Sequence, residues 1–141
     1  MDWTTIFQPG MKREEVFTVG PTHLASHVGS GAVSVLSTPS MIAFMEATSL
    51  HLLAEHLPEG YSSVGVNVNI SHLAPSLPGV QVHVTAEVLH LEGSVVELAV
   101  QVWDGSELVG DGTHRRAIID EARFLKRVAA KAAALPPVGG G

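Results

Sequence analysis

One long helix, apolar around most of its circumference, constrains the fold of this 141-residue chain more than any other feature. The helix is expected over residues 39–56, because apolar side chains recur in every turn and Pro58 follows its end. At its start, Thr38 stands directly before Pro39, which is typical of an N-cap followed by proline at the first helical position. A helix with so little polar surface is buried on several sides, so other elements must wrap around it.

Strand patterns lie on both sides of this helix. One strand is predicted before it, at residues 12–19, and four after it, at residues 64–73, 80–91, 94–104 and 107–119. Glu92-Gly93 and Asp104-Gly105 predict tight hairpins, so the last three strands form an antiparallel meander. The simplest arrangement is an α+β fold, in which an antiparallel sheet wraps around the central helix and leaves a sheet edge or face for a partner.

Two further segments complete a single predicted domain of residues 1–134. Residues 22–37 read as a loop that could act as a lid, and residues 120–134 as a C-terminal helix with acids in its first turn and bases later. Residues 135–141 are expected to form a flexible tail. Six of the eight Lys and Arg residues fall within residues 115–131. They form either a solvated helix face or a patch for an anionic ligand such as a nucleotide phosphate.

Composition and short motifs exclude several classes of protein. The net charge of −6 argues against a general nucleic-acid binder, and the absence of cysteine excludes disulfides and thiolate sites. The eight histidines match no metal-binding spacing, and P-loop, GxGxxG and GxSxG motifs are absent, so no metal is expected. No segment has the character of a secretory signal or a membrane span, so we expect a cytoplasmic protein with no membrane partner. With 45% hydrophobic and 16% charged residues, the chain favours a subunit interface.

Three polar side chains are candidates for chemistry, and each has a structural alternative. Glu46 is the only Asp, Glu, Lys or Arg between Glu15 and Glu55. A carboxylate on a buried helix is paired, shifted in pKa or exposed through a gap in the packing, unless it lies on a polar strip facing solvent. A hydroxyl at Thr38 suits a nucleophile or a group that polarises a carbonyl, although capping alone explains it. His72, at a strand end, suits proton transfer, although a surface histidine is the default.

The order of motifs along the chain resembles a known family. Residues 37–50 (STPSMIAFMEATSL), 63–88 (SVGVNVNISHLAPSLPGVQVHVTAEV) and 104–119 (DGSELVGDGTHRRAII) resemble the hot-dog-fold acyl-CoA thioesterases, most closely the fluoroacetyl-CoA thioesterase branch. The resemblance implies a hot-dog fold, dimers that join their sheets edge to edge, and a site at the dimer interface. It also implies catalytic roles for Thr38, Glu46 and His72, and substrate-binding roles for Gly65 and Arg116.

Helical spacing adds a constraint on this implied site. Thr38 and Glu46 are eight positions apart, about 12 Å along one helix, which is too far for direct contact. Another protomer, a bridging substrate or a water must therefore join them. We expect a homodimer, or a tetramer, that hydrolyses an acyl-CoA or related thioester to acid and thiol. Coenzyme A enters as part of the substrate, and no cofactor is expected. Either Thr38 attacks, or it orients a water that Glu46 activates, while His72 transfers protons.

Two other functions stay open. A hot-dog hydratase would act on an enoyl thioester, but residues 67–72 (NVNISH) lack the Asp and the Pro of its Asp-x-Asn-Pro-x-His signature. A non-catalytic acyl-CoA binding protein would hold the same ligand without turnover. Residues 26–37 contain no Phe, Tyr or Trp, whereas a highly selective small-acyl pocket is expected to use bulky gating groups there. The sequence therefore predicts a broader or different short acyl chain in place of fluoroacetyl selectivity.

Overall fold

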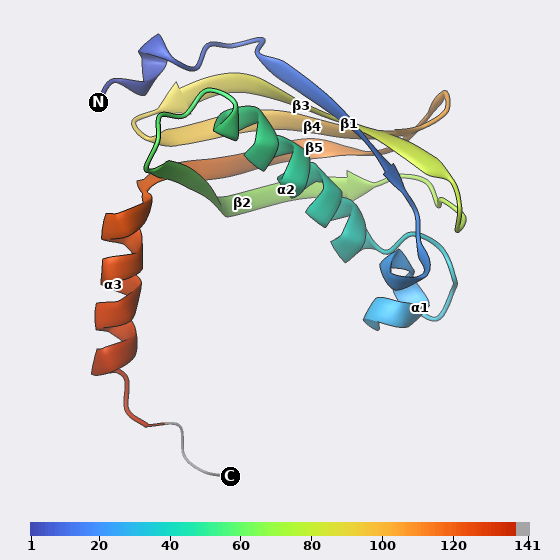
Figure 1. The fold of residues 1–141 in the computed structure, drawn as a ribbon. Coiled ribbons are helices and arrows are strands. Elements are labelled where there is room, and N and C mark those ends of the chain that lie inside the picture. Colours follow the sequence, from blue (N-terminus) through green and yellow to red (C-terminus); the bar gives the residue numbers. More distant parts are fainter. Residues whose placement is uncertain (138–141) are drawn as a thin grey trace.

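The computed structural model describes residues 1–137, and its central element is the apolar helix α2, Thr38–Ala54. Five antiparallel strands form one sheet that curves around this helix (Figure 1). The strands are β1 Lys12–Thr18, β2 Tyr61–His72, β3 Gln81–Glu92, β4 Val95–Asp104 and β5 Glu107–Asp120, in the spatial order β1-β3-β4-β5-β2. This is the α+β, hot-dog arrangement that the sequence predicts.

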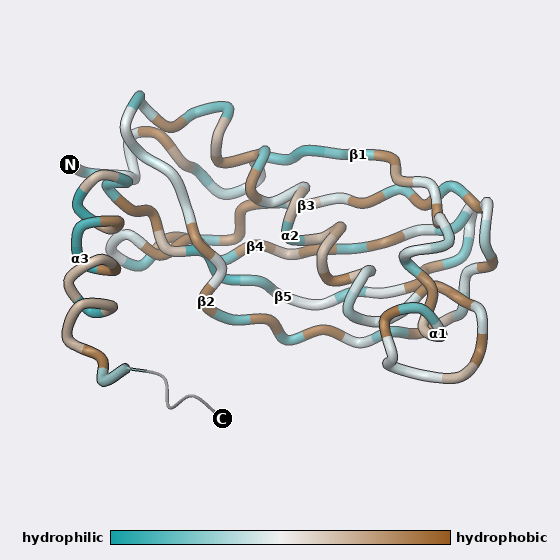
Figure 2. Tube along the Cα trace, turned by 60° about the horizontal axis from the view of Figure 1, so that its bottom comes forward, coloured by the Kyte–Doolittle hydropathy of each residue, from teal (hydrophilic) through white to brown (hydrophobic). Residues whose placement is uncertain are grey.

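The hydrophobic core lies between α2 and the face of the sheet that curves around it. Hydrophobic positions recur along the strands and along the helix (Figure 2). On β3, Val82, Val84 and Val88 have no exposed surface, and Met41 and Leu53 of α2 belong to the same cluster and are equally buried. Burying a side chain of this size contributes about 1.5–3 kcal/mol to folding. The apolar circumference of the helix is thus explained by the sheet around it.

Two-residue turns join β3 to β4 and β4 to β5. Two residues separate the end of each strand from the start of the next, and Gly93 and Gly105 are the first of the two in their turns. Their φ angles are +62° and +59°. Glycine enters this region without steric cost, and a tight hairpin requires it there. The predicted meander of the last three strands is confirmed.

The segment before α2 is more ordered than the loop predicted for residues 22–37. It starts within a 3-10 turn at Pro21–His23 and contains the short helix α1, Ala25–Val28; another 3-10 turn lies at Trp3–Thr5. An antiparallel bridge between Leu24 and Leu36 ties its two ends together. The loop prediction is wrong for residues 25–28, which form a helix, and correct for residues 29–35, which form turns and bends. The buried Leu36 and the partly buried Leu24 fix the ends of the segment against the core.

The C-terminal helix α3, Glu121–Ala134, extends away from the sheet (Figure 1). None of its residues is buried, and Leu125 and Val128 are 57% and 47% exposed. An amphipathic helix with an uncovered apolar side is typical of a protein that meets a partner. Of the tail predicted at residues 135–141, residues 138–141 lie outside the described residues. Within residues 1–137, no helix is long and apolar enough to cross a bilayer.

Candidate active site

Thr38 begins α2, and its hydroxyl faces His72 instead of the helix backbone. The N-cap is Ser37, whose side chain accepts a hydrogen bond from the Ser40 N–H at 3.1 Å. The prediction that Thr38 is the cap is wrong by one residue, because two hydroxyl residues precede Pro39 and either can cap. The Thr38 hydroxyl, which is not needed for capping, lies 2.8 Å from Nδ1 of His72.

His72 is the last residue of β2 and is half-buried. Its Nδ1 faces Thr38, whereas its Nε2 is buried and has no hydrogen-bond partner within the described residues. Burial lowers the pKa of His72 below its ordinary value, because the charged imidazolium is poorly solvated there. A neutral ring that carries its hydrogen on Nε2 can accept the Thr38 proton at Nδ1. The pair therefore has the geometry of a hydroxyl nucleophile and its general base.

The Thr38–His72 pair lines an open groove of about 350 Å³. One wall comes from the segment before α2 and the other from the turn after β2. The remaining lining residues are Ala25, Ser30, Val35, Leu36, Ser37, Leu73, Ala74 and Pro75. All of them are uncharged and most are small or aliphatic, so the groove suits a short apolar group next to a polar centre.

A second group of residues surrounds Glu46, two turns further along α2. The Glu46 side chain is 44% exposed, and its Oε2 lies 3.8 Å from Nη1 of Arg116. Gly65 on β2 makes this position possible, because a Cβ there would stand only 2.8 Å from Glu46 Oε2. A backbone without a side chain can thus approach the carboxylate closely, which explains the glycine.

Arg116 is fixed by hydrogen bonds to a single residue of β2. It is 5% exposed, and its Nε and Nη2 donate to the side-chain and backbone oxygens of Ser63, each at 2.9 Å. Burial lowers the pKa of Arg116, and the nearby Glu46 carboxylate opposes that shift. An arginine stays charged in either case. The result is a positive group held rigidly beside Glu46, suited to stabilise negative charge on a substrate.

His114 belongs to this second group, and no role for it was predicted from the sequence. It lies on β5 two residues before Arg116, so both side chains point to the same face of the sheet. It is 1% exposed; its Nδ1 lies 2.8 Å from the Asn67 carbonyl oxygen and its Nε2 lies 3.2 Å from Nη1 of Arg116. Burial lowers the pKa of His114, and Arg116 adds to that shift. The period-2 spacing from Arg116 is the signal that could have identified it.

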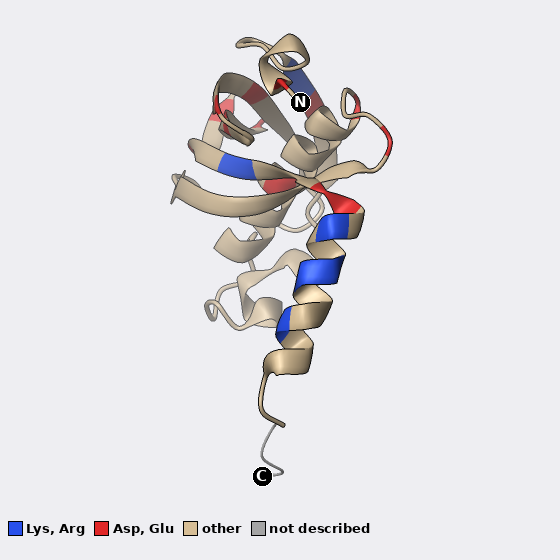
Figure 3. Ribbon diagram, turned by 90° about the vertical axis from the view of Figure 1, so that its left-hand side faces the viewer, with Lys and Arg blue, Asp and Glu red and all other residues tan. Residues whose placement is uncertain are grey.

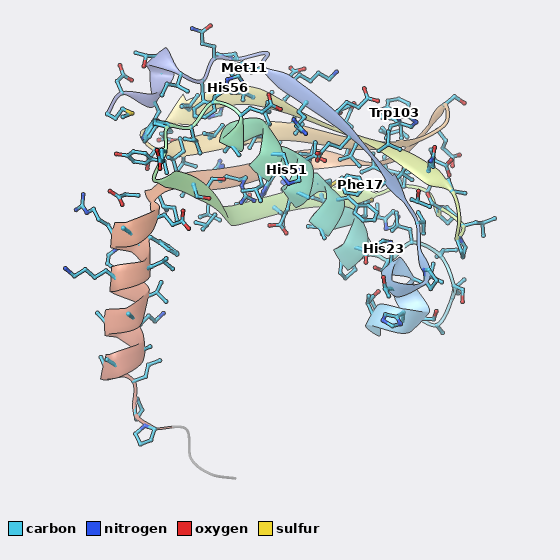
Figure 4. The ribbon with its side chains drawn as sticks, viewed as in Figure 1. Met11, Phe17, His23, His51, His56 and Trp103 are labelled. Atoms are coloured by element: carbon cyan, nitrogen blue, oxygen red, sulfur yellow. The ribbon has the colours of Figure 1, made fainter. Side chains whose placement is uncertain are left out.

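The other described histidines lie in ordinary surface contacts. His51, which projects from α2 in Figure 4, lies 2.9 Å from Glu15 of β1, and His23 accepts a hydrogen bond from the Gly20 N–H at 2.9 Å. Across residues 1–137, no three His, Asp or Glu side chains gather as metal ligands. Only His72 and His114 combine burial with a polar partner from the predicted site.

Within one chain, the two groups stay apart. In the part of the chain that the structure describes, no hydrogen bond or ion pair joins Thr38 and His72 to Glu46, Gly65 or Arg116. This separation agrees with the helical spacing of Thr38 and Glu46. A reaction that uses both groups needs a substrate that spans them or residues from a second chain.

The basic helix α3 lies far from the groove in the same chain. His72 pairs with Gly110 near the start of β5, whereas α3 follows Asp120 at the end of that strand. The ten residue-to-residue steps of β5 from Gly110 to Asp120 span about 33 Å along the strand. Figure 3 shows the positions of Lys and Arg, in blue, spread along α3. They cannot serve the Thr38–His72 groove of their own chain.

The chain matches known proteins over most of its length. A model of the fluoroacetyl-CoA-specific thioesterase family matches residues 19–122. The fluoroacetyl-CoA thioesterase of Streptantibioticus cattleyicolor is 35% identical over 97 residues, which make up 69% of this chain and 70% of that protein. All five predicted site residues fall inside the matched family segment.

Solved structures have the same architecture. A mutant of the fluoroacetyl-CoA-specific thioesterase in complex with fluoroacetate and CoA has a TM-score of 0.79 at 31% identity, covering 84% of this chain and 99% of that one. A hot-dog-like protein from Thermanaerovibrio acidaminovorans has a TM-score of 0.86 at 28% identity, covering 93% of this chain and 97% of that one. On this sequence and structural similarity, the chain belongs to the fluoroacetyl-CoA-specific thioesterase family.

Proposed function

We propose that this protein hydrolyses short-chain acyl-CoA thioesters to the free acid and CoA. The observation that carries the proposal is the 2.8 Å contact between the Thr38 hydroxyl and Nδ1 of His72 at an open, uncharged groove. A hydroxyl paired with a neutral histidine is one arrangement that supports acyl transfer. Membership of a thioesterase family supports the same reaction.

Two routes through the site fit this proposal. In the first, Thr38 Oγ1 attacks the thioester carbonyl, His72 takes the hydroxyl proton and returns it to the departing CoA thiolate, and water then cleaves the acyl-threonine ester. In the second, Thr38 orients a water that Glu46 deprotonates for attack on the carbonyl, and the proton passes through His72 to the departing CoA thiolate. The direct Thr38–His72 contact supports the first route. In both, Arg116 or a backbone N–H near Gly65 stabilises the negative oxygen that forms in the transition state.

The active form in this proposal is a homodimer, with Glu46 in the cleft between protomers. β2 is an edge strand, and its Val66 and Val68 are 54% and 44% exposed. Ala43 and Leu50 lie on the same side of α2 as Glu46 and are also accessible. An open strand edge beside an apolar helix face is a surface that proteins normally cover. A second copy joined at β2 would cover both and would supply the second group of residues to the Thr38–His72 groove.

The dimer has a direct test in solution. Val68→Asp places a charge on the β2 edge and should convert dimers to monomers in sedimentation experiments. The matched control is Val16→Asp on the opposite edge strand β1, because Val16 is similarly exposed at 50%. It should leave the dimer intact. Dissociation of both variants, or of neither, contradicts an interface at β2.

The acyl group is proposed to be short but not confined to fluoroacetyl. The segment that forms one wall of the groove contains no Phe, Tyr or Trp, and the residues that it contributes are small or aliphatic. Without bulky gating groups, the groove should accept acyl chains of several lengths. The relative from Streptantibioticus cattleyicolor is named for a single substrate, fluoroacetyl-CoA.

Thiol release from a panel of acyl-CoAs tests the proposed function. Wild-type protein should release CoA from several short acyl-CoAs, and Thr38→Val should not. Binding of acyl-CoA without release would instead identify an acyl-CoA binding protein. Hydration of an enoyl-CoA, followed as loss of the conjugated chromophore without free thiol, would identify a hydratase. Either result overturns the thioesterase proposal.

A further inference from the structure

His114 is the most completely enclosed ionisable side chain next to the predicted site. It is 1% exposed, yet both ring nitrogens have polar neighbours. A buried histidine that faces Arg116 is costly unless it makes favourable contacts, because Arg116 is cationic and also buried. The arrangement around the ring therefore fixes its protonation.

The two contacts of His114 determine which nitrogen carries the hydrogen. The Asn67 carbonyl oxygen can only accept, so Nδ1, at 2.8 Å, must donate to it. Arg116 can only donate, so Nε2, at 3.2 Å from Nη1, must accept. His114 is thus neutral, with its hydrogen on Nδ1. Both nitrogens are used, so none is left for a substrate.

The Asn67 contact reaches the irregular part of β2. Gly65 pairs with Arg116 and Asn67 with Arg115, so Val66 is an extra residue that forms a β-bulge. The bulge begins at the glycine that approaches Glu46 most closely, where a Cβ would lie 2.8 Å from Oε2. His114 Cε1 lies 3.2 Å from the same Cβ position. The His114 ring therefore contacts the bulge at Asn67 and the guanidinium of Arg116, and it lies next to Gly65.

We propose that His114 is a positioning residue, which holds the Arg116 guanidinium and the Gly65–Asn67 bulge in register with Glu46. It acts through Arg116 and does not touch the acyl group. Ser63 fixes Nε and Nη2 of Arg116, and His114 fixes the remaining nitrogen, Nη1, which is the one nearest Glu46. As a role in the thioesterase reaction, this rests on the proposed function.

Two substitutions separate positioning from simple packing. His114→Gln keeps one donor and one acceptor on its amide, whereas His114→Leu keeps the bulk and removes both. We expect His114→Leu to lower kcat for acyl-CoA hydrolysis about tenfold or more, with little change in KM, and His114→Gln to recover most of that loss. Equal activity of wild type and His114→Leu overturns the proposal, as does a folded His114→Gln as impaired as His114→Leu.

A double-mutant cycle asks whether His114 acts through Arg116. In an Arg116→Met background, His114→Leu should change kcat less than twofold, because the group that it positions is already gone. If the two single-variant losses in kcat multiply in the double variant, His114 does not act through Arg116.

A spectroscopic test does not depend on hydrolysis. In ¹⁵N NMR spectra of uniformly labelled protein at neutral pH, His114 should show a neutral ring protonated at Nδ1. The Arg116 Nε–H signal should persist in His114→Gln and broaden or shift in His114→Leu. An Nε2-protonated or charged ring overturns the positioning role. Inactive wild-type protein with the expected spectra would overturn only the proposed thioesterase function.

Discussion

The Thr38 hydroxyl lies 2.8 Å from Nδ1 of His72, across a contact between the start of α2 and the end of β2. The two consecutive hydroxyl residues at the start of α2 make different contacts. Ser37 caps the backbone, and Thr38, the first helical residue, turns its hydroxyl toward the histidine. The helix cap and the proposed nucleophile are therefore neighbouring side chains, so a mutation can change one without the other.

Thr38→Val should abolish most hydrolysis, and Ser37→Ala should not. Valine keeps the shape of threonine without the hydroxyl, so we expect a loss in kcat of at least about a hundredfold. Ser37→Ala removes the cap and should cost about 1 kcal/mol of folding free energy. Because Ser37 lines the groove but has no contact with His72, its loss in kcat should be much smaller than that of Thr38→Val. Steady-state kinetics and thermal unfolding of both variants check this. A wild-type kcat in Thr38→Val would show that the Thr38 hydroxyl takes no part in the reaction.

The pH dependence of hydrolysis should follow the lowered pKa of His72. The neutral ring is the form that accepts the Thr38 proton, so activity falls as the pH drops through that pKa. Because burial lowers the pKa, the acid limb of kcat/KM should lie below the ordinary histidine value of about 6.5. An NMR titration of the His72 ring should give the same midpoint. An acid limb of kcat/KM centred above the ordinary histidine pKa would contradict the role of His72 as a buried, neutral base.

Glu46→Gln should lower kcat by about a hundredfold or more, because it removes the charge while keeping the size of the side chain. The control is Glu55→Gln at the other end of the same helix, where the carboxylate forms an ion pair with Arg13 of β1. That pair is partly exposed to solvent and contributes little to stability. The control should keep wild-type rates, and equal rates in both variants would exclude Glu46 from the reaction.

Gly65→Ala tests the close approach of β2 to Glu46. The φ angle of Gly65 is not in the left-handed region, so alanine causes no backbone strain. Its Cβ would stand 2.8 Å from Glu46 Oε2, and the flexible carboxylate would move aside. A displacement of about 1 Å can cost roughly a hundredfold in rate. Gly20→Ala, whose nearest neighbour would be 3.6 Å away, is the control. Unchanged kcat in Gly65→Ala would show that the Glu46 position is not critical.

The sequence predicts the fold well because its strongest signals are local. The apolar helix, the alternating strand of residues 80–91 and the two glycine turns each specify one element, and together they leave one simple arrangement. The cap and His114 were missed for different reasons. Ser37 and Thr38 are chemically equivalent as caps until the position of His72 is known. His114 is one of eight histidines, and its role depends on a carbonyl from β2 and on Arg116, neither of which a linear pattern places beside it.

The basic helix α3 supplies the last prediction, which concerns the phosphates of CoA. α3 and the Thr38–His72 groove lie at opposite ends of β5 in one chain. In an antiparallel pairing of two β2 edges, the start of one β2 lies beside the end of the other, so α3 of the partner subunit would come close to this groove. Its positive charge would then meet the CoA phosphates.

Reversing the charge of Arg123, Lys126 and Arg127 to Glu should therefore raise KM for acyl-CoA about tenfold or more. The same variant should keep its KM for the matching acyl-pantetheine, which carries the thioester but no phosphates. A similar rise for both substrates would indicate a damaged fold, and no rise for acyl-CoA would show that α3 is only a solvated helix. Mixing this variant with a Thr38→Val variant adds a test of geometry. Heterodimers that pair a wild-type groove with a wild-type α3 from the other chain should recover low-KM activity, whereas neither parent has it.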